Sequence, residues 1–211
     1  MLVPENLTKK WIITGIVSGL LVSFIYPALM FISFPQAVQT VLIMIFGPLL
    51  AFSSAGLYFF ISLHKKTISA SAALVSNIIA GILITTMLLV QVAIRSSHPE
   101  EISDTSNWIW TSLNRVHLGL DASWDVYIAL GTLLFALSMF NHPKLGKIIS
   151  ISGLLISVAL IILNAISFPV PPSNAGLFDL GPIVGLWYFI ITLMIIFRLK
   201  WVDEKLKSYR D

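Results

Sequence analysis

Six long runs of apolar residues, separated by short polar or proline-containing segments, make up most of this chain. Each run approaches or exceeds the roughly 20 residues that a helix needs to cross a bilayer. Charged residues account for only 11% of the sequence, against about 25% in an ordinary soluble domain. Because so few charges cannot cover the surface of a soluble domain, the sequence predicts an all-α integral membrane protein. The expected transmembrane helices cover about residues 11–34, 38–63, 70–94, 124–140, 146–168 and 180–197, within a single six-helix domain over residues 1–211.

The basic residues predict how these six helices are threaded. With six spans, eleven lysines and arginines fall on one side of the membrane and only Arg95 and Arg115 fall on the other. Such an excess marks the cytoplasmic side, so we expect both termini to be cytoplasmic and the protein to lie in the cell (cytoplasmic) membrane. The eleven residues are Lys9, Lys10, Lys65, Lys66, Lys144, Lys147, Arg198, Lys200, Lys205, Lys207 and Arg210.

A weak internal repeat suggests how the helices are paired. The string Ile-Ser-Phe-Pro occurs at 32–35 and again at 166–169, and a Gly-Pro pair begins twelve residues after the proline in both copies. The first two spans and the last two spans therefore read as copies of one hairpin in the same orientation. With the third and fourth spans between them, the expected architecture is three helical hairpins.

The segment between the third and fourth spans is unusually rich in ionisable residues. On a helix of 100° per residue its polar residues fall within an arc of roughly 80°, and its apolar residues share a neighbouring face. This pattern predicts an extracytoplasmic amphipathic helix over about residues 107–120, lying at the outer membrane surface before helix four. On this interpretation the helix breaks at Gly119, and Asp121 or Ser123 caps the fourth span. The polar face comprises Asn107, Trp110, Asn114, His117, Asp121 and Asp125.

A second interpretation places the same polar face in a pocket that opens to the outside. His117 and Asp121 are four residues apart, so they stack on one helix face, where a carboxylate can orient an imidazole for acid–base work. Two such groups could also hold a metal, but a single histidine with carboxylates is a weak metal signature, and no metal is predicted. The candidate ligand-binding residues are Arg115, His117, Asp121, Trp124, Asp125 and Asp179.

Asp179 also has a simpler interpretation. It stands just before the last span, and Pro182 falls in the first turn of that helix. An aspartate before a helix start with an early proline is typical of helix capping.

The interiors of the six spans carry no Asp, Glu, Lys or Arg. Proton-coupled transporters and ion pumps place ionisable residues at that depth, so the sequence argues against a chain of proton carriers. The buried amides Asn77 and Asn164 are expected to form hydrogen bonds between helices. Small residues such as Gly15 and Gly19 are expected to allow close helix packing.

Several other functions are disfavoured by composition. The formal charge of +3 comes from lysines and arginines at helix ends, so it does not indicate nucleic-acid binding. With no cysteine, the chain has neither a disulfide nor a thiolate metal ligand. His64 and His142 lie at helix ends beside lysines, where we expect them to be solvated and not to ligate haem. No cofactor is predicted.

The sequence favours a membrane protein that binds or handles a lipid-like or amphipathic small molecule in an outward-facing polar pocket. One alternative is an enzyme acting on lipid headgroups, with His117 or Asp121 as general base and Arg115 holding a phosphate. Another is a non-catalytic membrane subunit that assembles through its small-residue helix faces. The sequence leaves these classes open.

Overall fold

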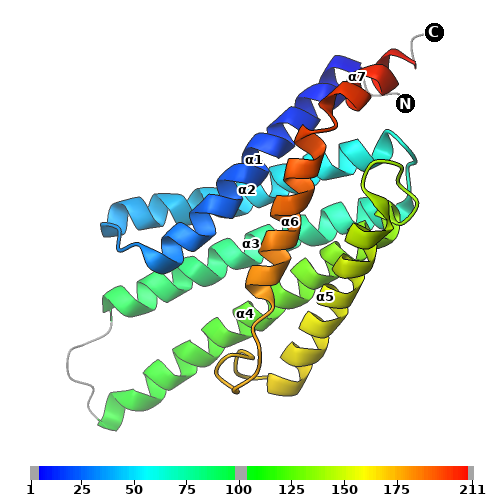
Figure 1. Cartoon of the computed structure of the whole chain (residues 1–211). Coiled ribbons are helices and arrows are strands. Elements are labelled where there is room, and N and C mark those ends of the chain that lie inside the picture. The colour runs from blue at the N-terminus through cyan, green and yellow to red at the C-terminus, as the bar shows by residue number, and fades with distance from the viewer. Residues whose placement is uncertain (1–4, 98–103, 209–211) are drawn as a thin grey trace.

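The computed structural model describes residues 5–97 and 104–208, and these two ranges are entirely helical apart from short connections (Figure 1). Five of the helices are long and apolar enough to cross a membrane, and a bent pair, α6 with α7, supplies a sixth candidate span. The predicted class, an all-α multi-pass membrane protein, is confirmed. The helices are α1 (Glu5–Phe31), α2 (Gln36–Ser62), α3 (Ile68–Ser97), α4 (Asp104–Met139), α5 (Gly146–Ser167), α6 (Gly181–Ile196) and α7 (Leu199–Lys207).

The helices form a closed bundle in which each long helix packs against its neighbours in sequence. The beginning of α1 and the end of α7 lie at one end, which we call the terminal end, and the connections 32–35 and 168–180 lie at the opposite, distal end (Figure 1). α6 closes the bundle by packing against α1 and, less extensively, against its hairpin partner α5.

The expected break before the fourth span is absent. α4 runs without interruption from Asp104 to Met139, so the amphipathic segment 107–120 is part of this helix and not a separate one. Gly119 stays helical because one glycine costs a helix only about 1 kcal/mol, and the exposed apolar residues before it continue the apolar surface of the span. Ser123 donates a hydrogen bond to the carbonyl of Gly119 (2.8 Å), so it does not cap a helix start. At 1.5 Å per residue, α4 is about 54 Å long.

α7 is a second difference from the sequence prediction. It follows α6 after a bend of 58° and buries Val202 and Leu206. The sequence pattern ended the last span at residue 197 because the following residues are too polar to cross a membrane. Lys9 on α1 forms an ion pair with Asp203 on α7 (2.6 Å), which holds α7 against the terminal end.

Glycines bring α1, α2 and α3 into direct backbone contact. Gly15 on α1 faces Gly56 on α2, and Gly47 on α2 faces Gly81 on α3. A methyl group at any of these positions would collide with the facing backbone. The expectation that small residues allow close packing is confirmed for Gly15, and it follows that α2 is held closely on both sides.

A buried polar network joins four helices at the centre of the bundle. The side-chain amide of Asn77 on α3 donates to the hydroxyl of Ser54 on α2 (2.9 Å) and to that of Tyr188 on α6 (2.8 Å). Thr132 on α4 also donates to the Tyr188 hydroxyl (3.2 Å). Ser54, Asn77 and Thr132 are at most 1% exposed. The predicted role of Asn77 in binding helices together is confirmed.

His142, by contrast, is not solvated as the sequence suggested. Its side chain is 2% exposed and packs against the rings of Phe60 and Trp201, and its ring centroid lies 5.3 Å from that of His64. The backbone N–H of Lys144 donates to its Nδ1 (3.2 Å), so the neutral ring carries its proton on Nε2, which is buried. Burial lowers the pKa of His142 to about 4, and the charge of His64 acts in the same direction. α7 causes this burial, since it brings Trp201 over a turn that the sequence left open to solvent.

Replacing Asn77 tests the central network. Asn77→Leu removes the hydrogen bonds to α2 and α6 and should lower the free energy of unfolding by about 1–2 kcal/mol. The matched control is Ser76→Ala, because Ser76 is also buried but bonds only to Ala72 of its own helix. Thermal unfolding in detergent measures both variants. Equal melting temperatures for the two would mean that the network does not hold the helices together.

The burial of His142 predicts acid sensitivity. The folded state binds this proton only near pH 4, whereas the unfolded chain binds it near the ordinary value of 6.5. Stability is therefore full above about pH 6.5 and falls as the pH drops towards 4, by up to about 3 kcal/mol. His142→Phe keeps an aromatic ring and should flatten this part of the pH profile of the melting temperature. His64→Phe, at an exposed position of the same end, should leave the slope largely in place.

Candidate functional site

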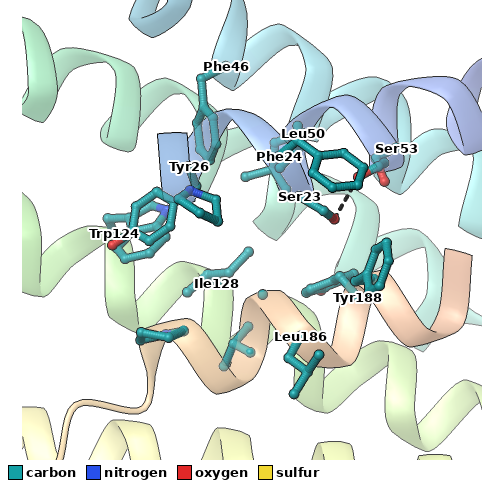
Figure 2. Close-up of a pocket in the computed structure, with 18 residues that line it drawn as sticks. Ser23, Phe24, Tyr26, Phe46, Leu50, Ser53, Trp124, Ile128, Leu186 and Tyr188 are labelled. Carbon is teal, nitrogen blue, oxygen red and sulfur yellow. Dashed lines mark hydrogen bonds between the residues drawn. The ribbon is translucent and has the colours of Figure 1, made fainter. Parts of the chain in front are cut away.

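A cavity of about 280 Å³ lies between α1, α2, α4 and α6 (Figure 2). α1 and α6 touch where Gly19 meets the side chain of Thr192, and the cavity occupies the distal side of this contact, where the two helices leave room between them. We call it the α1/α6 cavity. It is lined by Gly19, Val22, Ser23, Phe24, Tyr26, Pro27, Phe46, Leu50, Ser53, Trp124, Ile128, Gly181, Pro182, Val184, Gly185, Leu186, Tyr188 and Phe189.

The two ends of the cavity differ in chemistry. Tyr26 and Trp124 stand at its distal end, and Ser53 and Tyr188 stand at the other, which we call the floor (Figure 2). The hydroxyl of Tyr188 is held by Asn77, so the central polar network fixes the floor. Between the ends the walls are mostly aliphatic or aromatic, and Ser23 is the polar side chain labelled there (Figure 2).

The cavity opens sideways, between α1 and α6. Phe24 on α1 and Leu186 on α6 line it yet remain 67% and 55% exposed. Large exposed apolar side chains on long apolar helices face lipid, because no water-soluble surface would leave them uncovered. The opening therefore faces the bilayer.

Three carboxyl groups gather beside the distal end of the cavity. Asp121 and Asp125 are on α4, Asp179 precedes α6, and their charges act on one another and on the Tyr26 side chain. Asp125 is only 5% exposed and lies near the side chain of Asn164 on α5. The side-chain amide of Asn164 donates to the carbonyl of Leu160 on its own helix (3.1 Å), so the hydrogen bond between helices expected of it is not found among the described residues. The structure thus gathers the three predicted aspartates next to a cavity that the sequence did not locate.

Asp179 bonds to the start of α6, as its capping role requires, but from the residue before the N-cap position, which Leu180 occupies. Its Oδ1 accepts the backbone N–H of Gly181, the first residue of α6, at 2.9 Å. The carboxylate therefore satisfies one of the free N–H groups at the helix start. The side chain is exposed, so this bond leaves much of it accessible.

The other predicted site residues divide into two groups. Trp124 lines the cavity, and its indole Nε1 is buried with no hydrogen-bond partner within residues 5–97 and 104–208. Arg115 and His117 lie closer to the N-terminal end of α4 than Trp124 does. His117 is half-buried with Nε2 unpartnered in those same ranges and feels the charge of Arg95 on α3, while Arg115 is exposed. No hydrogen bond or ion pair joins His117 to Asp121, and no three acidic or histidine side chains converge as metal ligands, in the described part of the chain.

Sequence reasoning missed most of the cavity wall. Phe46, Leu50 and Ile128 are ordinary apolar residues of their spans, and nothing in the sequence separates them from the packed core. Tyr26 and Pro27 carried the available signal, since a tyrosine and a proline inside a transmembrane helix interrupt an otherwise apolar run.

Comparisons with protein-family models, with curated proteins and with solved structures find no match for this chain. Its own fold and site therefore define it as a polytopic α-helical membrane protein with a laterally open cavity.

Two substitutions at Asp179 separate the effect of its hydrogen bond to the start of α6 from the effect of its charge. Asp179→Ala removes both the cap and the charge and should lower the free energy of unfolding by about 1 kcal/mol. Asp179→Asn keeps an oxygen that can accept the Gly181 N–H and removes a charge beside two other carboxyls, so it should be at least as stable as the parent. Thermal unfolding of both variants checks this. An equal loss in both would mean that the charge, and not the cap, stabilises α6.

Proposed function

We propose that the protein binds a lipid-like or amphipathic small molecule in the α1/α6 cavity. The observation that carries this proposal is a cavity with an apolar body, a polar distal end and an opening towards lipid. A molecule with an acyl or aryl portion enters such a site from the bilayer and leaves its polar group at the distal end.

The size of the cavity favours part of an amphiphile over a whole phospholipid. Sites for small molecules commonly enclose roughly 300–1,000 Å³, and this cavity lies at the lower limit of that range. A single alkyl chain or a small ring system fits this volume. The rest of a larger molecule would extend through the opening between Phe24 and Leu186.

The polar atoms at the distal end support a ligand that offers hydrogen bonds. A buried N–H without a partner costs about 1–3 kcal/mol, and Trp124 Nε1 is such a group. Pro27 has no N–H, so the carbonyl of Ser23 four residues earlier also lacks its usual helical donor. Trp124 and Ser23 both line the cavity, where a polar group of the ligand could bind to them.

The excess of basic residues at the terminal end supports an orientation. With that end in the cytoplasm of a cell-membrane protein, the distal end of the cavity and its carboxyl groups lie in the outer leaflet. The ligand would then come from that leaflet or from the extracytoplasmic medium.

A binding protein fits the positions of the polar residues better than a lipid-headgroup enzyme does. An acid–base pair would need His117 within hydrogen-bond reach of its partner, whereas among the described residues its Nε2 has no hydrogen-bond partner and the charge of Arg95 acts on the imidazole. Arg115 is exposed and stands more than two helical turns from Asp125, so a phosphate held by Arg115 would lie away from the cavity.

A single cysteine in this cysteine-free chain tests occupancy of the cavity. Ser23→Cys places a thiol in its wall, and Val158→Cys places one on the exposed face of α5 at a similar distance from the distal end. Adding a lipid extract to purified protein should slow the reaction of the first thiol with N-ethylmaleimide several-fold. The second thiol should react at an unchanged rate.

A substitution that fills the cavity tests whether the lipid binds there. A Cβ at Gly185 meets no atom within 4 Å, so Gly185→Phe can occupy the cavity without moving the backbone. Gly119 has equally open surroundings but does not line the cavity. Protection of the Ser23→Cys thiol by lipid should disappear with Gly185→Phe and persist with Gly119→Phe. Protection that survives both substitutions would contradict the proposed site.

A further inference from the structure

The carboxyl groups beside the cavity lack a cationic partner. Asp121, Asp125 and Asp179 form no ion pair with any lysine or arginine of the described residues, where the recorded ion pair, Lys9 with Asp203, lies at the opposite end. The charge of Arg95, a basic residue on α3, acts on His117. Asp179 accepts the backbone N–H of Gly181, a cavity-lining residue that also lies beside the Trp124 ring, and Asp125 directly follows Trp124 on α4. The three carboxyl groups therefore lie beside the distal end of the cavity, and no basic side chain of the described residues forms an ion pair with them.

The aromatic residues at the same end can also receive a positive charge. Tyr26 lines the cavity and is the side chain on which the charges of all three aspartates act. Trp124 stands with it at the distal end (Figure 2). The face of a tyrosine or tryptophan ring attracts an ammonium or guanidinium group, most strongly where water is excluded.

We propose that the ligand of the α1/α6 cavity is a cationic amphiphile, whose ammonium-type group binds among Asp121, Asp125, Asp179 and the rings of Tyr26 and Trp124. This inference rests on the proposed function and adds the charge of the ligand to it. The apolar part of the ligand lies along Leu50, and its positive group remains at the distal end.

A backbone carbonyl and the three carboxyl groups both favour a positively charged ligand group. The Ser23 carbonyl, deprived of its helical donor by Pro27, can accept a hydrogen bond from an ammonium N–H. An anionic head group at the same place would meet three carboxyl groups and be repelled. The site therefore discriminates by the sign of the charge.

The test compares amphiphiles that share a twelve-carbon chain and differ in head group. Dodecyltrimethylammonium, dodecylphosphocholine and dodecyl sulfate are each titrated against the Ser23→Cys protein in nanodiscs, and protection from N-ethylmaleimide is measured. The cationic amphiphile should protect at a concentration about tenfold or more below that of the anionic one, with the zwitterion between them.

Variants that remove a carboxyl charge test whether the preference for a cationic amphiphile arises at Asp121 and Asp125. Asp125→Asn and Asp121→Asn should each weaken protection by dodecyltrimethylammonium and leave that by dodecylphosphocholine nearly unchanged. Asp203→Asn removes the same charge from exposed α7 and should change neither.

The two proposals fail in different ways. If all three amphiphiles protect the thiol equally, or the anion protects best, the cationic preference is overturned and the binding function stands. If none of them protects it, and the lipid extract does not either, both proposals fall. A cationic preference that persists in Asp121→Asn and Asp125→Asn alike would also overturn the assignment, because it would then arise elsewhere.

Discussion

The fold depends on the hydrogen bonds that Asn77 makes at the centre of the bundle. An amide inside a membrane protein must find partners within the protein, since lipid offers none. Asn77 finds them on α2 and α6, and Thr132 adds α4 through the same Tyr188 hydroxyl. These bonds fix α6 against the remaining helices, and so they fix the ring that forms the floor of the α1/α6 cavity.

The cavity follows from where small residues bring helices together and where they do not. Gly15 presses α1 onto Gly56, and Gly19 admits Thr192 and Ser53, so the terminal half of α1 is tightly held. Beyond that contact, Gly185 of α6 lines the cavity, and a Cβ there would meet no atom within 4 Å, so the space that a larger side chain would occupy stays open. Close packing on one side of Gly19 and missing side chains on the other together produce an opening towards lipid.

Sequence reasoning recovered the fold class because apolar runs of about 20 residues have few alternatives in a membrane. It failed at Gly119, because the continuous apolar surface of α4 outweighs the helix-destabilising effect of a single glycine. It also missed α7, whose position depends on contacts with α1. Of the residues that line the cavity it singled out Trp124, while its candidates Asp121, Asp125 and Asp179 lie outside the cavity lining. The cavity walls could not be predicted, because apolar residues that line a void have the same local pattern as apolar residues that fill a core.

The unbroken α4 also explains how two carboxyl groups come to lie beside an apolar cavity. Had the chain turned at Gly119, the residues before and after it would have had independent directions. In one straight helix, Asp121 and Asp125 share a face one turn apart, and that face reaches from half-buried surroundings to the 5% exposure of Asp125. An isolated carboxylate at that depth is costly unless it is hydrogen-bonded or neutralised. Asn164 lies near Asp125, but its amide donates to the carbonyl of Leu160 on its own helix. Among the described residues no side chain supplies the neutralising charge, and a bound cation would.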